Sequence, residues 1–315
     1  MLHLIAQPSR LTFRFPFRIA HGVRTGTDVV FVTVEGNGFI GRGEATLPPY
    51  LPDTIDSVMA FLAKPEVYQI PEDMHPEAWM KHLIGQGHTC MPGLAALDMA
   101  LWQWFAAVSD VSLPDALGTE ERPTPHTYTL GLSDREEMKQ KFDFGRENGF
   151  ELFKLKLDGQ NDAQVIEDYL SISNFPFAVD ANQGWSDLDR AISFCQELEK
   201  AGCVLVEQPF HKTDRSMSKA LRETLSIPLI ADEAVQTIAD LPSIAESFDG
   251  INIKLQKCGG LTTGLEMVRE ARTLGMKVLI GCMSESSIGC GAAEALAGEC
   301  DWADLDGPFL ILPIE

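Results

Sequence analysis

Three carboxylate side chains lie at a regular spacing, each at the end of a short apolar run. Asp180 ends the run in "FAVDAN", Glu207 that in "VLVEQPF" and Asp232 that in "LIADEA", and successive acids are about 25 residues apart. A single acid at such a position can simply cap the next helix. Three that converge would repel one another and resist burial unless a cation joined them, and Mg²⁺ prefers such oxygen ligands. We therefore expect a magnesium site on these three residues.

Two lysines of the stretch "FKLKLDG" alternate with apolar residues, so Lys154 and Lys156 would share one face of a strand. A third lysine, Lys254, ends the apolar run "GINIK". A surface strand would give the first pattern without any function, but the neighbouring acids favour an inward orientation. Repulsion by Lys154 would lower the pKa of Lys156 and make it a usable base. We expect Lys156 and Lys254 to flank a metal-bound substrate from two sides, with Lys257 as the alternative to Lys254.

The elements that must position these side chains follow a strand–helix rhythm after residue 120. Between apolar runs, polar segments such as 134–148, 186–200 and 260–274 carry apolar residues at helical spacing. This alternation predicts a parallel sheet, and seven or eight units favour a closed barrel over an open doubly wound sheet. In a barrel the carboxyl ends of the strands form the active site. The candidate strands span residues 124–130, 150–157, 175–182, 204–210, 227–234, 250–256 and 277–283.

The first 120 residues predict a different architecture. Residues 10–19 and 28–45 have the pattern of antiparallel strands, with a hairpin turn at Asn37-Gly38 and a Gly- and Thr-rich loop over 20–27. Helices are expected over 53–64, 74–84 and 92–107. No Ser- or Gly-rich linker follows this α+β region, so we expect it to pack closely on the later strands.

The composition limits the classes of function. The chain of 315 residues has a formal net charge of −21, which argues against nucleic acids or an anionic membrane surface as partners. Its seven cysteines form no CxxC pair, which indicates reduced thiols and a cytoplasmic location. The nearly apolar stretch 90–109 is interrupted by Pro92, Asp98 and Gln103, so we expect a buried helix rather than a membrane span. The N-terminus lacks the pattern of a secretion signal.

Taken together, the motifs resemble the enolase superfamily, and within it the muconate-lactonizing subgroup. The resemblance implies an α/β fold: a (β/α)7β TIM-like barrel over 121–304, preceded by an α+β capping domain over 1–120. The tail, 305–315, is expected to pack back on the capping domain. The motifs that carry the resemblance are Lys154-x-Lys156, Asp180-x-Asn182, Glu207-Gln208-Pro209, Asp232-Glu233, Lys254 followed by Gly259-Gly260, "GRGEA" and "ALDMALWQ".

The end of the chain narrows the implied activity. Asp304 and Asp306, after the last expected barrel strand, resemble the Asp-x-Asp element with which dipeptide epimerases hold the α-ammonium group of the substrate. The resemblance implies Mg²⁺-dependent epimerisation of a dipeptide at the α-carbon of its C-terminal residue, by 1,1-proton transfer through an enediolate. Lys154 would contact the substrate. Three further residues would support the metal ligands or a lysine, with a simple helix N-terminal charge as the alternative for the last: Asn182, Glu233 and Glu285.

Other activities remain open at this point. Muconate cycloisomerases, o-succinylbenzoate synthases and N-succinylamino acid racemases share the lysine and metal motifs, and only Asp304-x-Asp306 separates a dipeptide epimerase from them. Mandelate racemases use a histidine base on the seventh strand, and "KVLIGCM" contains none. A non-enzymatic barrel that binds a metabolite would need the metal and one lysine only. A homo-oligomeric assembly is compatible with the sequence.

The preferred dipeptide is suggested by the loop "AHGVRTGT" over 20–27, which this fold would place above the barrel mouth. Arg24 is its one fixed charge, and a guanidinium group suits a carboxylate. This predicts an L-Ala-D/L-Glu-like substrate. Arg24 could equally be a solvated charge, and His21 or Tyr50 could shape a pocket for an apolar or aromatic residue.

Overall fold

The computed structural model describes residues 1–19 and 22–313 and begins with a three-stranded antiparallel sheet. Its strands are β1 (His3–Ile19), β2 (Gly22–Gly36) and β3 (Phe39–Leu47), in that order across the sheet. The loop expected over 20–27 is therefore wrong from Gly22 onward. β-branched residues such as Val23 and Thr25 favour a strand, and β1 continues far enough to pair with them, up to Ile19 opposite Gly22. Residues 20–21 lie outside the described part.

Four helices cover this sheet: α1 (Ile55–Leu62), α2 (Pro65–Tyr68), α3 (Pro76–Gly85) and α4 (Met91–Ser109). The "GRGEA" motif allows α4 to lie directly on β3, since a Cβ atom on Gly41 or Gly43 would come within 1.9 Å of a carbonyl oxygen of α4. Helix α4 is buried, as expected. None of the helices in the described residues is long and apolar enough to cross a membrane.

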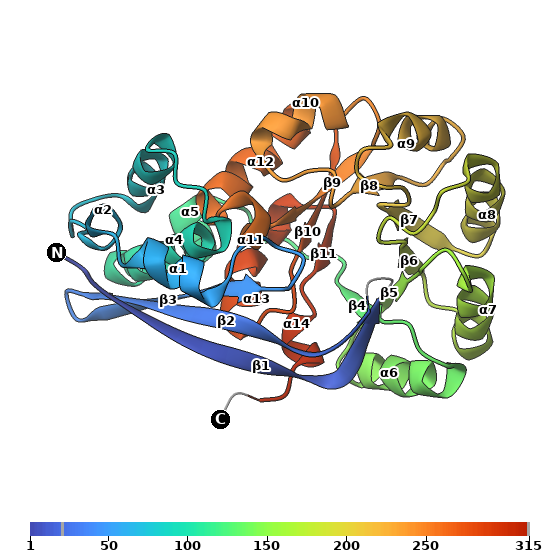
Figure 1. The fold of residues 1–315 in the computed structure, drawn as a ribbon, viewed down its shortest axis with the longest axis horizontal. Coiled ribbons are helices and arrows are strands. Elements are labelled where there is room, and N and C mark those ends of the chain that lie inside the picture. Colours follow the sequence, from blue (N-terminus) through green and yellow to red (C-terminus); the bar gives the residue numbers. More distant parts are fainter. Residues whose placement is uncertain (20–21, 314–315) are drawn as a thin grey trace.

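The remainder of the chain forms an eight-stranded parallel sheet that curls into a nearly closed barrel with helices outside it (Figure 1). The first and last strands meet through a bridge between His126 and Ala303, and the Ala303 N–H donates to the carbonyl of Pro125 at 2.9 Å. The strands are β4 (Thr127–Leu130), β5 (Leu152–Lys156), β6 (Phe177–Asp180), β7 (Cys203–Glu207), β8 (Leu229–Ala231), β9 (Gly250–Lys254), β10 (Lys277–Gly281) and β11 (Trp302–Asp304).

The barrel helices alternate with these strands, as the strand–helix rhythm predicts. The helices from the capping domain onward are α5 (Leu113–Leu117), α6 (Arg135–Glu147), α7 (Asp162–Ile172), α8 (Leu188–Lys200), α9 (Arg215–Arg222), α10 (Leu241–Ile244), α11 (Leu255–Cys258), α12 (Leu261–Thr273), α13 (Ser287–Glu294) and α14 (Gly307–Leu310). One expectation was wrong: Asp304 is the last residue of β11 rather than a residue beyond the last strand. Three residues are too few to show strand periodicity.

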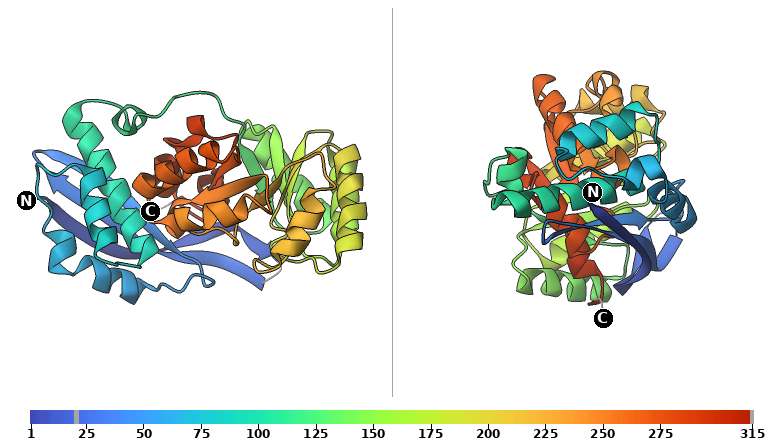
Figure 2. Two further views of the ribbon diagram at one scale, coloured as in Figure 1. Left: turned by 90° about the horizontal axis from the view of Figure 1, so that it is seen from above. Right: turned by 90° about the vertical axis from the view of Figure 1, so that its left-hand side faces the viewer.

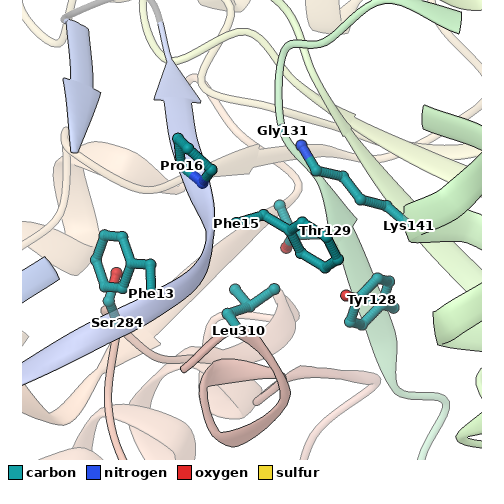
Figure 3. Close-up of a pocket in the computed structure, with 9 residues that line it drawn as sticks. All are labelled: Phe13, Phe15, Pro16, Tyr128, Thr129, Gly131, Lys141, Ser284 and Leu310. Carbon is teal, nitrogen blue, oxygen red and sulfur yellow. The ribbon is translucent and has the colours of Figure 1, made fainter. Parts of the chain in front are cut away.

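The long β1–β2 ribbon reaches from the capping helices to the barrel (Figures 1 and 2). Its register shifts between Thr12 and Phe17, and within this bulge Phe13 pairs with Ile311. The Leu312 N–H also donates to the Thr12 carbonyl at 2.8 Å. Figure 3 shows side chains of the bulged segment facing β4 and α14 across a small pocket. The barrel and the C-terminal segment thus hold the ribbon in place.

Candidate active site

The three acids at the strand ends converge. Asp180 and Glu207 end β6 and β7 and are paired in register, and Asp232 follows β8 directly. Each offers a carboxylate oxygen within 4.8 Å of the other two, and all three side chains are buried. Among the described residues this is the group of acids that could hold a metal ion. Three buried oxygen donors at this spacing fit a hard divalent cation such as Mg²⁺.

The electrostatics of the three acids differ. Burial raises the pKa of Glu207 to about 7. Burial alone would also raise the pKa values of Asp180 and Asp232, but adjacent lysines outweigh it and lower both. The site therefore combines two firmly ionised carboxylates with one that a cation would help to ionise.

Lys156 and Lys254 come from β5 and β9, which are four strands apart in the eight-stranded barrel and so lie on opposite sides of its mouth. Lys156 Nζ donates to Asp180 Oδ2 at 2.7 Å, and Lys254 Nζ donates to Asp232 Oδ2 at 2.7 Å. Both line one cavity together with Asp232. The geometry thus provides two ammonium groups that face the same space from two sides.

Lys257, the alternative to Lys254, is also buried next to Asp232. Its Nζ donates to Asp232 Oδ1 at 2.6 Å, to the Asp232 carbonyl at 2.7 Å and to the Asn252 carbonyl at 3.1 Å. An ammonium group has three donors. All three are used here, which suits a residue that fixes Asp232 better than one that exchanges protons with a substrate.

Lys154 has a different environment from the one expected. Its Nζ lies 2.8 Å from Asp304 Oδ2, 2.7 Å from Glu207 Oε2 and 3.3 Å from Asp180 Oδ2. These carboxylates overcome the effect of burial and raise the pKa of Lys154. The charge of Lys154 is therefore neutralised locally, and the geometry does not support the expected effect of Lys154 on Lys156. Among the described residues, Lys156 lines the cavity, whereas Lys154 does not.

Asp304 and Asp306 both face the cavity next to β4. Asp304 accepts a hydrogen bond from the Thr127 hydroxyl and contacts Lys154, whereas Asp306 Oδ2 accepts from the Thr129 N–H at 2.6 Å. Burial and the neighbouring Asp304 raise the pKa of Asp306 to about 7. Burial opposes ionisation of Asp304 as well, but Lys154 outweighs it and lowers the pKa. Because Asp304 is already paired with Lys154 and Asp306 accepts from a backbone N–H, Asp306 is the carboxylate better able to bind a further cation.

The cavity has a volume of about 600 Å³ and lies between the barrel mouth and the capping domain. From the capping domain, Arg24 and Tyr50 line it. Burial lowers the pKa of Arg24, and the nearby Tyr50 partly offsets this effect. The guanidinium also lies 5.3 Å from the ring centre of Phe13. Arg24 therefore lines the cavity, but it lies on strand β2 and not in the expected loop.

The three residues expected to support the site divide into two groups. The Asn182 N–H donates to Asp180 Oδ1 at 2.8 Å, and its side-chain amide donates to Glu233 at 3.4 Å. The partner of Glu233 is thus Asn182 rather than a lysine. Glu285 instead accepts from the Met283 N–H at 2.7 Å and from Gln256 at 3.1 Å. It lies behind the cavity wall, just before Ser286, the N-cap residue of α13.

Asn252 was missed in the sequence. Its side-chain amide donates to Glu207 Oε1 at 2.8 Å and so orients one of the acids. The signal was present, because Asn252 lies two residues before Lys254 and shares its face of β9, as Lys154 and Lys156 share a face of β5. Thr127 and Thr129 alternate in the same way on β4, but threonine is common in strands and carries little information there.

Two family models match the chain. The model for the mandelate racemase / muconate lactonizing enzyme N-terminal domain matches residues 1–118, and the enolase C-terminal domain-like model matches residues 137–301. The fold and the site thus define a member of the enolase superfamily, and the chain belongs to its mandelate racemase / muconate lactonizing enzyme family.

Individual relatives show which members of this family the chain is similar to. An L-Ala-D/L-Glu epimerase from Bacteroides thetaiotaomicron is 35% identical over 307 residues, which cover 96% of this chain and 79% of the relative. A solved dipeptide-epimerase homologue from Agrobacterium tumefaciens, with bound sodium and L-Ala-L-Glu, is 28% identical and has a TM-score of 0.88; the match covers 100% of this chain and 94% of the other. The dipeptide epimerase from Enterococcus faecalis, solved with Mg and L-Leu-L-Tyr, is 25% identical with a TM-score of 0.90, over 99% and 91% of the chains.

Proposed function

We propose that the protein is an isomerase that epimerises dipeptides at the α-carbon of the C-terminal residue. The observation that carries this proposal is the placement of Lys156 and Lys254 on opposite sides of one cavity, above three converging acids. Two ammonium groups in this arrangement can serve the two faces of one α-carbon. The similarity to dipeptide epimerases supports the same reaction.

The metal requirement is part of the proposal. Asp180, Glu207 and Asp232 would hold Mg²⁺, which supplies Lewis-acid stabilisation of the negative charge that develops on the substrate carboxylate. A cation there would also compete with Lys156 and Lys254 for their carboxylate partners. Each lysine would thereby gain freedom to approach the substrate.

The steps assigned to this chain are proton transfers. One lysine, in its neutral form, accepts the α-proton on one face, and the other, as an ammonium, donates a proton to the opposite face. Asp306, with Asp304 beside it, would hold the N-terminal ammonium group of the dipeptide. The substrate would thus be fixed at both ends while the configuration at its second residue changes.

The side-chain preference that we propose is acidic, as in L-Ala-D/L-Glu. Arg24 is a half-buried guanidinium in the cavity wall, which is suited to a carboxylate. An apolar or aromatic second residue is the competing proposal, because the Tyr50 hydroxyl contacts Met283 Sδ at 3.2 Å and both line the same cavity. The Enterococcus faecalis relative was solved with L-Leu-L-Tyr.

We also propose a cytoplasmic location for the reaction. All seven cysteines are free thiols, and six of them are buried. Reduced cysteines are typical of the cytoplasm.

The test of the reaction is a library of L,L-dipeptides incubated with the protein and MgCl₂ in heavy water. Epimerisation incorporates one solvent deuteron at the C-terminal α-carbon, which mass spectrometry detects. We expect incorporation and formation of the L,D product for Ala-Glu first. Turnover of N-succinylamino acids in place of free dipeptides would contradict the proposal, and so would full turnover in strong chelator.

A further inference from the structure

A second cluster of buried acids lies at the joint between the capping domain and the barrel. Glu44 of β3 and Glu285, which precedes α13, are exposed by 0% and 1%. Within the described residues neither carboxylate forms an ion pair. The metal-site acids and their lysines do not explain these two buried carboxyl groups.

Glu44 crosses from the capping sheet to the N-terminus of α13, which packs against β3 (Figure 1). Its carboxylate accepts from the Ser286 hydroxyl, from the Ser286 N–H at 3.0 Å and from the Gly289 N–H at 3.3 Å. The Thr46 hydroxyl donates to it at 2.8 Å. Unpaired N–H groups at a helix N-terminus favour an anion, and here an acid of the other domain provides it.

Gln256 connects the two acids. It accepts from the Thr46 N–H at 3.1 Å and donates to the Glu44 carbonyl at 2.9 Å, so its amide pairs with β3 as a neighbouring strand would. The same amide donates to Glu285 at 3.1 Å. Gln256 lies two residues after Lys254, which links the joint to the end of β9.

The cluster lies directly behind the part of the cavity next to α13. Glu285 accepts from the Met283 N–H, and Met283 and Ser284 line the cavity. The backbone of Glu285 also packs on Gly307, where a Cβ atom would lie 2.4 Å from the Glu285 carbonyl oxygen. Gly307 follows Asp306. The cluster therefore touches the backbone beside three cavity-lining groups: Lys254, Met283 and Asp306.

We propose that Glu44 is a positioning residue for the active site, which acts through Ser286, Gln256 and Glu285. It fixes the segment 282–286 and the turn after Asp306 relative to the capping domain. Burial of a carboxylate without a counter-ion is unfavourable in free energy, and an apolar contact would join the two domains with a smaller desolvation penalty. Directional hydrogen bonds instead set a single register between the domains. The catalytic part of this inference rests on the proposed epimerase function.

The variants that test it are Glu44→Gln and the milder Ser286→Ala, with Glu35→Gln as the matched control. Glu35 lies on β2 of the same sheet, with its side chain 43% exposed. Two readouts are compared: amide hydrogen exchange of peptides over 282–290 and 304–309, and kcat and KM for L-Ala-L-Glu. The change in Tm on addition of MgCl₂ is measured in parallel, because the proposed Mg²⁺ ligands lie elsewhere in the barrel: Asp180 and Glu207 end β6 and β7, and Asp232 follows β8.

We expect Glu44→Gln to accelerate exchange in those two segments and to reduce kcat/KM by roughly 10- to 100-fold, the range that small misplacements produce. The effect of MgCl₂ on Tm should stay unchanged, and Glu35→Gln should behave as wild type. Faster exchange with unchanged kinetic constants would overturn the positioning role, and so would exchange that rises uniformly over the chain. If Glu44→Gln does not fold, Ser286→Ala is judged by the same criteria. If the wild type converts no dipeptide, the proposed function fails, and exchange alone then decides whether Glu44 holds these segments.

Discussion

Asp232 of the candidate metal site is held by two lysines. One carboxylate oxygen accepts from Lys254, a proposed base, and the other accepts from Lys257, the lysine that fixes Asp232 in place. The strand-end position and the residue type predicted that it lies beside Asp180 and Glu207. Nothing in the sequence predicted its partners, because Lys254 and Lys257 differ only in which of them lies on β9 and which on the following turn of helix. That distinction depends on where the strand ends.

Loss of one acid should abolish the response to the metal. We expect Asp180→Asn, Glu207→Gln and Asp232→Asn each to lose activity and also the rise in Tm that MgCl₂ gives the wild type. Mg²⁺ at 100 times its Kd would stabilise the wild type by about 2.7 kcal/mol. The measurement is thermal unfolding with MgCl₂ and with chelator.

Asp301→Asn is the control for these variants, since Asp301 also pairs with basic residues, Arg272 and Lys277, but lies at the other end of the barrel. It should lower Tm and keep the magnesium response. A full response in Asp232→Asn would rule out this residue as a ligand.

The two proposed bases should be separable by isotope exchange. Replacement of Lys156 or Lys254 by Ala stops epimerisation, because one face loses its proton carrier. Each variant should still exchange the α-proton of one epimer with heavy water, and the two variants should retain opposite epimers. Mass spectrometry of purified L,L and L,D dipeptides measures this. Lys257→Ala is the comparison, and epimerisation that survives Lys254→Ala but not Lys257→Ala would reverse the assignment.

At the scale of elements, the β1–β2 ribbon carries Arg24 from the capping sheet to the barrel mouth. The strand–helix rhythm predicted the barrel well, because each parallel strand is a short buried run between amphipathic helices. It failed where elements are short or where a long strand contains glycines. β11 has three residues, and two glycines and two threonines, Gly22, Gly26, Thr25 and Thr27, gave the start of β2 the composition of a loop. Pairing with β1, a contact between distant residues, overrides that composition.

Arg24 should determine the preference for an acidic dipeptide. We expect Arg24→Ala to reduce kcat/KM for L-Ala-L-Glu by about 10- to 100-fold, the equivalent of roughly 1.5–3 kcal/mol for a hydrogen bond to a charged group. L-Ala-L-Phe should be affected little. Steady-state kinetics with both substrates provide the comparison.

Arg10→Ala is the matched control on the same ribbon, because Arg10 pairs with Asp28 on the exposed surface. It should leave both substrates unaffected. Equal losses for both substrates in Arg24→Ala would show that the residue supports the ribbon and does not recognise a side chain.

At the scale of the whole molecule, buried polar contacts between described residues join the capping domain to the barrel at two places. Glu44 caps α13, and Asp98 of α4 accepts from the Thr262 N–H at 2.7 Å and from its hydroxyl at 2.8 Å at the start of α12. In both cases an acid of the capping domain meets a helix N-terminus of the barrel. The sequence indicated close packing through its lack of a linker, but it could not indicate these contacts, since each joins residues more than 150 positions apart.

The contact of Asp98 should make the stability of the molecule depend on pH. Burial raises the pKa of Asp98 from 3.8 to about 7. Between these values the folded protein keeps a proton that the unfolded chain has lost, so this group's contribution to stability is complete below about pH 4 and is lost as pH rises through 7. We therefore expect Tm to decline between pH 5 and 8 more steeply in the wild type than in Asp98→Asn, with each kcal/mol worth roughly 2–4 °C. Thermal unfolding in chelator at four pH values measures the two slopes.

Asp110→Asn is the control, because Asp110 ends the same helix at φ 55°, a conformation that asparagine tolerates, and its slope should match the wild type. Parallel profiles for wild type and Asp98→Asn would mean that Asp98 stays ionised in the folded protein and that the N-terminus of α12 holds it as an anion.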